Sequence, residues 1–159
     1  MTMSKRERVD ACIAAIHNAI GGELTAGNIG KLTADQVTLL VWETLRDEMM
    51  SGGFVQLIYN GYGTFVFKNP FAKAVKAWGM TELSKLVYDA HRLYKKHHER
   101  IETDCDDDEF MALYEQFPDF DELDDEFVDN EEKWTEQIAD YIEGHIENFD
   151  LEDINIQGK

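Results

Sequence analysis

The sequence predicts an all-α protein, a single compact domain of about six or seven helices with an acidic C-terminal third. Apolar residues recur three and four positions apart along most of the chain. Helix-capping patterns precede two of these stretches, and the 159 residues include only two prolines. A hydrophobic fraction of 43% is enough for a folded core. We expect residues 1–150 to form the domain and residues 151–159 to be a flexible tail.

Two capping boxes predict the first two helices. Ser4 and Glu7 can each accept a hydrogen bond from the other's backbone N–H, and Gly21-Gly22 ends the helix that follows. Thr33 and Gln36 match the same pattern, and their helix should stop at 51–53. The apolar positions of these helices are Val9, Cys12, Ile13, Ile16 and Ile20, then Val37, Leu40, Val41, Leu45 and Met49.

Residues 54–67 fit two local structures. Asn60-Gly61 separates two apolar runs, a pattern typical of a β-hairpin. Phe54, Leu57 and Ile58 also share one face of a helix. The local pattern leaves both structures open.

The rest of the chain predicts further helices. Asn69-Pro70 is typical of an N-cap followed by the first helical residue, and a longer helix should begin near Thr81 and end in basic residues that favour its C-terminus. In the acidic third, apolar spacing predicts helices around 110–117, 120–127 and 134–149, with Asn130 capping the last.

The charge is unevenly distributed along the chain. The formal net charge is −18, but residues 1–100 hold 13 Lys and Arg against 10 Asp and Glu, whereas residues 101–159 hold 2 against 23. The first part therefore nets +3 and the second −21. Such a surface repels nucleic acid and anionic membranes and attracts basic proteins. We expect a basic protein as partner, no direct contact with nucleic acid and no contact with membranes.

Cysteine content and targeting signals indicate a cytoplasmic protein. Cys12 and Cys105 lie 93 positions apart, which does not suggest a disulfide framework. No signal peptide and no long apolar run are visible.

The sequence predicts neither a metal nor a cofactor. Asp104, Asp106, Asp108 and Glu115 fit four positions of a calcium loop, but Glu109 stands where that loop needs glycine. No histidine follows a glutamate by three, as a di-iron bundle requires, and no spacing supports zinc. Nucleophile-elbow, P-loop, dinucleotide and metalloprotease motifs are missing, so we predict that the protein is not an enzyme.

One segment resembles a known family. Residues 51–63 resemble the Gly-Gly-Phe-x-Gln-Phe-Phe-x-Asn-x-x-Gly signature of a bacterial domain family of mostly unknown function that is related to a DNA-mimic protein. Residues 71–83, 120–127 and 141–145 look like other parts of that family, so the resemblance covers about 32–150. Ser51 replaces a common Asn, and Leu57-Ile58 replaces two aromatics. The signature positions are Gly52, Gly53, Phe54, Gln56, Asn60 and Gly63.

The resemblance implies an all-α fold, which favours a helix at 54–60, and an acidic surface that imitates DNA. No catalytic residue comes with it. We interpret the six signature residues as structural, with the glycines permitting a tight corner between helices.

The acidic stretch from Asp104 to Glu132 is the candidate site. It holds 15 Asp and Glu among 29 residues and no Lys or Arg. A continuous helix would carry about one charge per 3 Å over roughly 44 Å, close to the roughly 3.4 Å per charge of one DNA strand. The predicted partner-binding residues are Asp106, Asp107, Asp108, Asp121, Glu122, Asp124, Asp125, Glu131 and Glu132.

Several alternatives stay open. The stretch is also compatible with a solvated face that only keeps the protein in solution. An immunity or antitoxin protein would use the same face to cap one basic toxin. An enzyme would instead use a concave pocket at the Gly52–Gly63 corner, with a carboxylate of raised pKa. The protein is expected to be a monomer or a homodimer.

Overall fold

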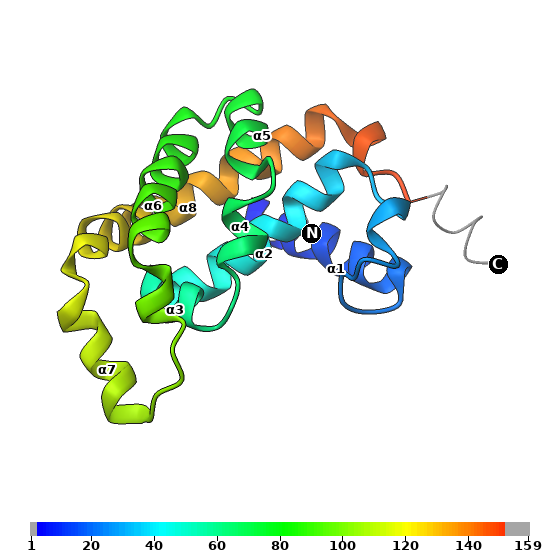
Figure 1. Cartoon of the computed structure of the whole chain (residues 1–159). Coiled ribbons are helices and arrows are strands. Elements are labelled where there is room, and N and C mark those ends of the chain that lie inside the picture. The colour runs from blue at the N-terminus through cyan, green and yellow to red at the C-terminus, as the bar shows by residue number, and fades with distance from the viewer. Residues whose placement is uncertain (1–2, 152–159) are drawn as a thin grey trace. The chain divides into compact units, whose positions relative to one another are not determined.

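The computed structural model describes residues 3–151, which form α-helices and short 3-10 turns without any strand (Figure 1). The predicted all-α fold is confirmed. The helices are α1 Lys5–Ile20, α2 Ala34–Ser51, α3 Gly53–Tyr59, α4 Gly63–Phe67, α5 Phe71–Ala77, α6 Thr81–Ile101, α7 Asp107–Gln116 and α8 Asp121–Gly144. The 3-10 turns are η1 Ile29–Lys31, η2 Pro118–Phe120 and η3 Ile146–Phe149.

The chain divides into two compact units. The first unit comprises residues up to Glu43 and from Glu132 onward, and the second comprises Thr44–Glu131. Helices α2 and α8 each contribute to both units. The expectation of one domain over residues 1–150 stays a prediction, and residues 152–159 of the expected tail lie outside the described part of the chain.

The first unit confirms both predicted capping boxes. Glu7 N–H donates to Ser4 Oγ at 3.1 Å and Ser4 N–H donates to Glu7 Oε1 at 3.3 Å. Helix α1 then ends at Gly21, whose φ of +85° lies in the left-handed region. At the start of α2, Gln36 N–H donates to Thr33 Oγ1 at 3.1 Å and Thr33 N–H donates to Gln36 Oε1 at 2.8 Å.

The start of α2 also binds the segment after α8. Thr33 Oγ1 donates to the Asn148 carbonyl at 2.6 Å, and the Asp35 carboxylate accepts from Tyr141 Oη at 2.8 Å and from Asn148 Nδ2 at 3.0 Å. Burial and the bond to Asp35 raise the pKa of Tyr141 to about 12. These bonds explain why the chain turns back after Gly144.

In the second unit, α6 packs against α3, α4 and α5. Phe54 and Phe67 are buried with ring centroids 6.1 Å apart, and Phe67 lies 5.0 Å from Tyr94 of α6. Leu83 and Leu86 point from α6 into the same core. This aromatic core supports the helices that carry the candidate site.

Residues 54–59 and 63–67 are helical and 60–62 form the turn between them, which decides between the two local structures left open by the sequence. Gly61 has a φ of +89°, Tyr62 N–H donates to the Leu57 carbonyl at 3.1 Å, and Gly61 N–H donates to the Ile58 carbonyl at 3.0 Å. This is the Schellman motif of a helix end. Because a hairpin turn also requires a left-handed glycine, Asn60-Gly61 alone cannot distinguish the two.

Two predicted helix starts are wrong in detail. Asn130 does not cap a helix, because α8 is continuous through it and its side chain donates to the Glu126 carbonyl at 2.8 Å. No glycine or proline interrupts residues 119–143, so the two predicted helices merge into one. Pro70 precedes α5 rather than opening it, although the Asn69 side chain does accept the Phe71 N–H at 2.7 Å.

The corner between α2 and α3 is tightly packed. Phe54 N–H donates to the Asp124 carboxylate at 2.9 Å, and a Cβ on Gly53 would lie only 2.5 Å from Asp124 Oδ2. Gly53 also has a φ of +84°. The backbone conformation and the carboxylate therefore both require glycine at this position.

Other signature residues also make contacts within the fold. Gln56 Nε2 donates to Ser51 Oγ at 2.6 Å, and Asn60 Nδ2 donates to Glu48 Oε1 at 2.6 Å. Both amides thus tie α3 to the end of α2. A Cβ on Gly63 would collide with the Tyr94 ring.

We predict that Gly53→Ala lowers the free energy of unfolding by about 2–4 kcal/mol, because it adds left-handed strain to a clash with Asp124. Gly61→Ala is the matched control, since Gly61 has a similar φ but no neighbouring atom within 4 Å of the position that a Cβ would take. It should lose only about 1–2 kcal/mol. Denaturant unfolding of both variants measures the difference. Equal losses of unfolding free energy would show that the clash with Asp124 does not contribute to stability.

Candidate functional site

Helix α7 begins in a cluster of carboxylates. Asp106 is its N-cap and accepts the Glu109 N–H at 2.8 Å, while Asp106 N–H donates to Glu109 Oε1 at 3.2 Å. Asp107 and Asp108 follow in the first turn and are exposed. Negative charge is favourable at a helix N-terminus, so the fold accommodates these acids together.

Helix α8 presents a second set of acids in the same unit. Asp121 and Glu122 lie in its first turn and are exposed. Asp125 and Asp129 follow Asp121 at four-residue intervals, so they lie on one helical face about 6 Å apart along the axis. The inward positions are aromatic, with Phe120 and Phe127 fully buried.

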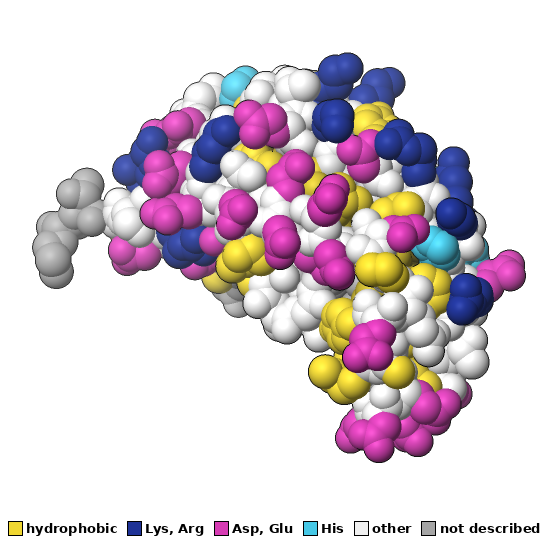
Figure 2. Space-filling model, turned by 90° about the vertical axis from the view of Figure 1, so that its left-hand side faces the viewer, with side chains coloured by type: hydrophobic (Ala, Val, Ile, Leu, Met, Phe, Trp, Pro, Cys, Tyr) yellow, Lys and Arg dark blue, Asp and Glu magenta, His cyan; other side chains and the backbone are white. Residues whose placement is uncertain are grey.

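We define the acidic surface as a set of eight exposed carboxylates on α7 and α8 in the Thr44–Glu131 unit. Figure 2 shows Asp and Glu side chains gathered at the tip where α7 begins, while Lys and Arg gather along another edge of that face. The members are Asp106, Asp107, Asp108, Asp121, Glu122, Asp125, Glu126 and Asp129.

Cations do not neutralise the acidic surface. Within residues 3–151, none of its members takes part in an ion pair. The neighbouring Asp119 is paired, with His97 Nε2 at 3.3 Å. In the other unit, by contrast, Lys5 pairs with Asp140 at 3.0 Å, and Arg8 pairs with Glu143. The unpaired negative charge is therefore available to an external partner.

The structure separates the nine predicted residues into three groups. Six belong to the acidic surface, and Glu132 is exposed but lies in the other unit. Glu131 is only 6% exposed and Asp124 is half-buried, so neither is offered to a partner in the way that its sequence position suggested. The prediction included them because a run of acids does not show which side faces inward.

Sequence reasoning missed Glu126 and Asp129. They lie four residues after Glu122 and Asp125 and are exposed on the same helix. Treating the sequence after residue 120 as one continuous helix would have placed both residues on its exposed side. The assumed cap at Asn130 obscured that continuity.

Asp124 has an unusual environment for a carboxylate in an acidic stretch. Burial is the main cause that raises its pKa from 3.8 to about 6, and the charges of Asp121 and Asp125 add to the effect. The hydrogen bond from Phe54 N–H acts in the opposite direction. Tyr114, which donates to the Gly52 carbonyl at 3.0 Å, also has a raised pKa, mainly because of burial.

The pH dependence of stability follows from this pKa. Because the folded-state pKa exceeds the ordinary value, the folded state binds the Asp124 proton more tightly, and its contribution to stability is lost as pH rises from about 4 through 6. We predict that Asp124→Asn, which keeps the acceptor for Phe54 N–H, is more stable than the unaltered protein at pH 7 by about 1–2 kcal/mol.

At pH 4 the same comparison should give almost no difference, since Asp124 is then largely protonated in the folded state. Asp129→Asn, an exposed acid of the same helix with the same change in charge, is the control. Denaturant unfolding at both pH values measures the effect. A stability difference for Asp124→Asn that does not change with pH would contradict the assignment.

The Gly52–Gly63 corner has a carboxylate of raised pKa, but its glycines are closely packed against neighbouring side chains. Gly53, Phe54, Leu57 and Ile58 are buried, and the Phe54 N–H occupies the inward oxygen of Asp124. Among residues 3–151, no three His, Cys, Asp or Glu side chains are placed to hold a metal ion. No helix in that range is long and apolar enough to span a membrane.

The fold and the surface define an all-α protein with an unpaired acidic face, and comparison with known proteins identifies its family. Residues 30–145 match the family described as DMP19-like protein. The chain is also 35% identical over 119 residues to "DNA mimic protein DMP19" of Neisseria meningitidis serogroup B, a match that covers 74% of this chain and 72% of the relative. The chain belongs to the DMP19-like protein family.

This membership confirms the family resemblance inferred from residues 32–150. The match does not single out the six signature positions, so their status as a family signature stays a prediction.

Proposed function

We propose that this protein is a non-catalytic DNA mimic, which binds a basic, DNA-binding protein through the acidic surface and blocks its access to DNA. The observation that carries the proposal is the unpaired negative charge of that surface, in a chain related to a protein named a DNA mimic. The proposed setting is the cytoplasm, with the protein acting as a monomer or homodimer.

The charge density of α8 supports the proposal. Five exposed carboxylates occur between Asp121 and Asp129, which is about 12 Å of helix axis. One DNA strand carries a phosphate every 3.4 Å or so, giving a similar density. A basic protein surface that accepts a DNA backbone would therefore meet a comparable field here.

The stretch does not form one long line of charge. Pro118 and the η2 turn separate α7 from α8, so the acids form two groups rather than the single helix of roughly 44 Å that an unbroken stretch would make. The proposed mimicry therefore concerns local charge density and not the full path of a DNA strand.

The acidic surface also includes apolar contact points. Met111 of α7 is 63% exposed and Val128 of α8 is 50% exposed. Charges mainly accelerate association, whereas buried apolar side chains slow dissociation. We infer that Met111 and Val128 allow the protein to select one partner among the many basic proteins of a cell.

The charge contribution can be tested with a matched pair of variants. In the first, Glu122→Gln, Asp125→Asn and Asp129→Asn neutralise three members of the acidic surface. In the control, Glu99→Gln, Glu136→Gln and Glu147→Gln neutralise three exposed acids elsewhere, so both variants have the same net charge.

The unaltered chain, immobilised, should capture from the source lysate a DNA-binding protein that duplex DNA elutes. The first variant should bind this protein on the order of tenfold more weakly and with a shallower salt dependence, whereas the control should bind normally. Equal binding by both variants would contradict the proposal. A single captured protein that neither DNA nor salt elutes would instead favour an immunity-type role.

The apolar contribution has a different signature. Met111→Ser with Val128→Ser should raise the dissociation rate of the captured protein several-fold and leave the salt dependence unchanged. Ile146→Ser, which alters a 65% exposed residue of the other unit, should have no effect. Surface plasmon resonance separates the two rates. A loss confined to the association rate would refute the assigned role of the apolar residues.

A further inference from the structure

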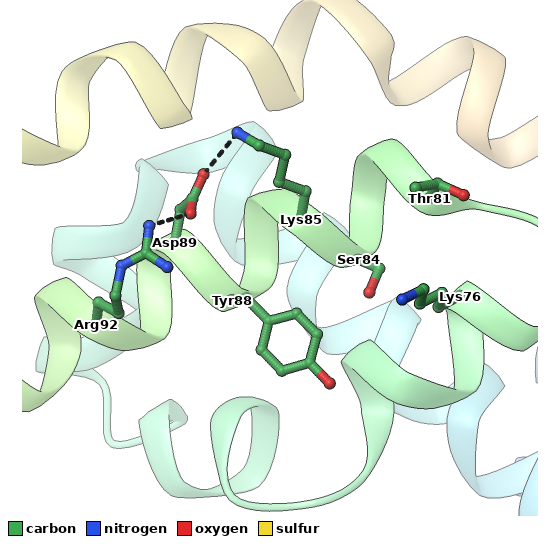
Figure 3. A pocket seen from close by; sticks show the side chains of 7 residues that line it. All are labelled: Lys76, Thr81, Ser84, Lys85, Tyr88, Asp89 and Arg92. Atoms are coloured by element: carbon green, nitrogen blue, oxygen red, sulfur yellow. Dashed lines mark hydrogen bonds and ion pairs between the residues drawn. The ribbon is translucent and has the colours of Figure 1, made fainter.

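A groove whose charged side chains are mainly basic lies between α5 and α6, within the Thr44–Glu131 unit. Its volume of about 420 Å³ is within the range of small-molecule sites, and it is open to solvent. Figure 3 shows Lys76 reaching from α5 toward Ser84 of α6, with the Tyr88 ring one turn further along α6. The groove shares no residue with the acidic surface.

Positive charge dominates the lining of this groove. It contains Lys76, Lys85 and Arg92 against one carboxylate, Asp89. Asp89 accepts from Lys85 Nζ at 3.2 Å and also pairs with Arg92. Within the described part of the chain Lys76 forms no ion pair, so its ammonium is available to an added anion.

The surroundings of the groove strengthen this charge. Residues 68–100 hold eight Lys and Arg and three Asp and Glu, a net charge of +5 in a chain of −18. Exposed Lys95 and Lys96 continue the basic character of α6 beyond the groove. More than half of the chain's 15 basic residues thus lie within 33 positions, and carboxylates of the same segment are too few to balance them.

Tyr88 adds a flat apolar surface to the lining. Its side chain is 47% exposed, which is uncommon for a large ring in a folded unit. A ring of this kind can stack on a planar group of a ligand, while its hydroxyl remains in water. Cations and an aromatic ring next to each other form the combination that binds nucleotides in other proteins.

We propose that the α5–α6 groove binds a small phosphate-bearing molecule of nucleotide size. Lys76, whose ammonium lies near Ser84, binds the phosphate, whereas Lys85 and Arg92 pair with Asp89 and add only to the positive field around the groove. The planar part of the ligand stacks on Tyr88. A long nucleic acid is disfavoured because a net charge of −18 repels a polyanion, whereas one phosphate group experiences mainly the local field.

The test uses the full chain with three probes at constant ionic strength: adenosine monophosphate, inorganic phosphate and adenosine. Backbone amide chemical shifts should move at residues 76–92 with the monophosphate, in the millimolar range. Inorganic phosphate should move a subset of them more weakly, and adenosine should have almost no effect. Tyr88→Ala should reduce the affinity for the monophosphate to that for inorganic phosphate.

Lys76→Met retains the aliphatic stem and removes the charge, and it should weaken monophosphate binding about tenfold. Lys96→Met makes the same charge change on α6 outside the groove and should change the affinity by less than about twofold. Two results would overturn the proposal. One is the absence of shifts at residues 76–92, and the other is an equal loss in both variants, which would mean diffuse screening of a basic surface.

Discussion

The contact of the Asp124 carboxylate with the backbone of Gly53 and Phe54 is the constraint on which the acidic surface depends. It joins the first turn of α8 to the start of α3, and Phe54 adds an aromatic contact with Phe120 at 6.1 Å. Because this one carboxylate turns inward, its neighbours Asp121 and Asp125 face water. The helix that carries the acidic surface is therefore positioned by one of its own acids, which burial keeps partly protonated near pH 6.

The acids of α7 and α8 are compatible with folding because each group is stabilised by nearby parts of the chain. The carboxylates of α7 and α8 concentrate at helix N-termini, where the backbone N–H groups favour negative charge. The basic end of α6 contacts the turn between these helices. Arg100 lies 4.9 Å from the centre of the Phe117 ring, and His97 contacts Asp119. The acids of the Thr44–Glu131 unit are thus part of folded helices, and an anionic groove ligand and a cationic partner would bind different residues of that unit.

Local sequence patterns predicted the all-α class, the capping boxes at Ser4 and Thr33 and a helix that ends near residue 117, because each depends on neighbours within one or two turns. They could not decide whether Asn60-Gly61 ends a helix or turns a hairpin, since both need a left-handed glycine. They also missed that Glu131 is buried and that Asp124 caps α3, because the partner of Asp124 lies 70 positions away. Composition located the acidic stretch, but only the packing of Phe120 and Phe127 showed which of its acids are exposed.

In the proposed function, the acidic surface occupies the DNA-binding site of another protein. The most direct test is a competition in which the partner, purified and bound to labelled duplex DNA, is titrated with the full chain at several salt concentrations. DNA should be released stoichiometrically, and the affinity of the chain for the partner should fall steeply as salt increases. Formation of a stable ternary complex that retains the DNA would contradict the proposed function, because the chain would then bind outside the DNA site.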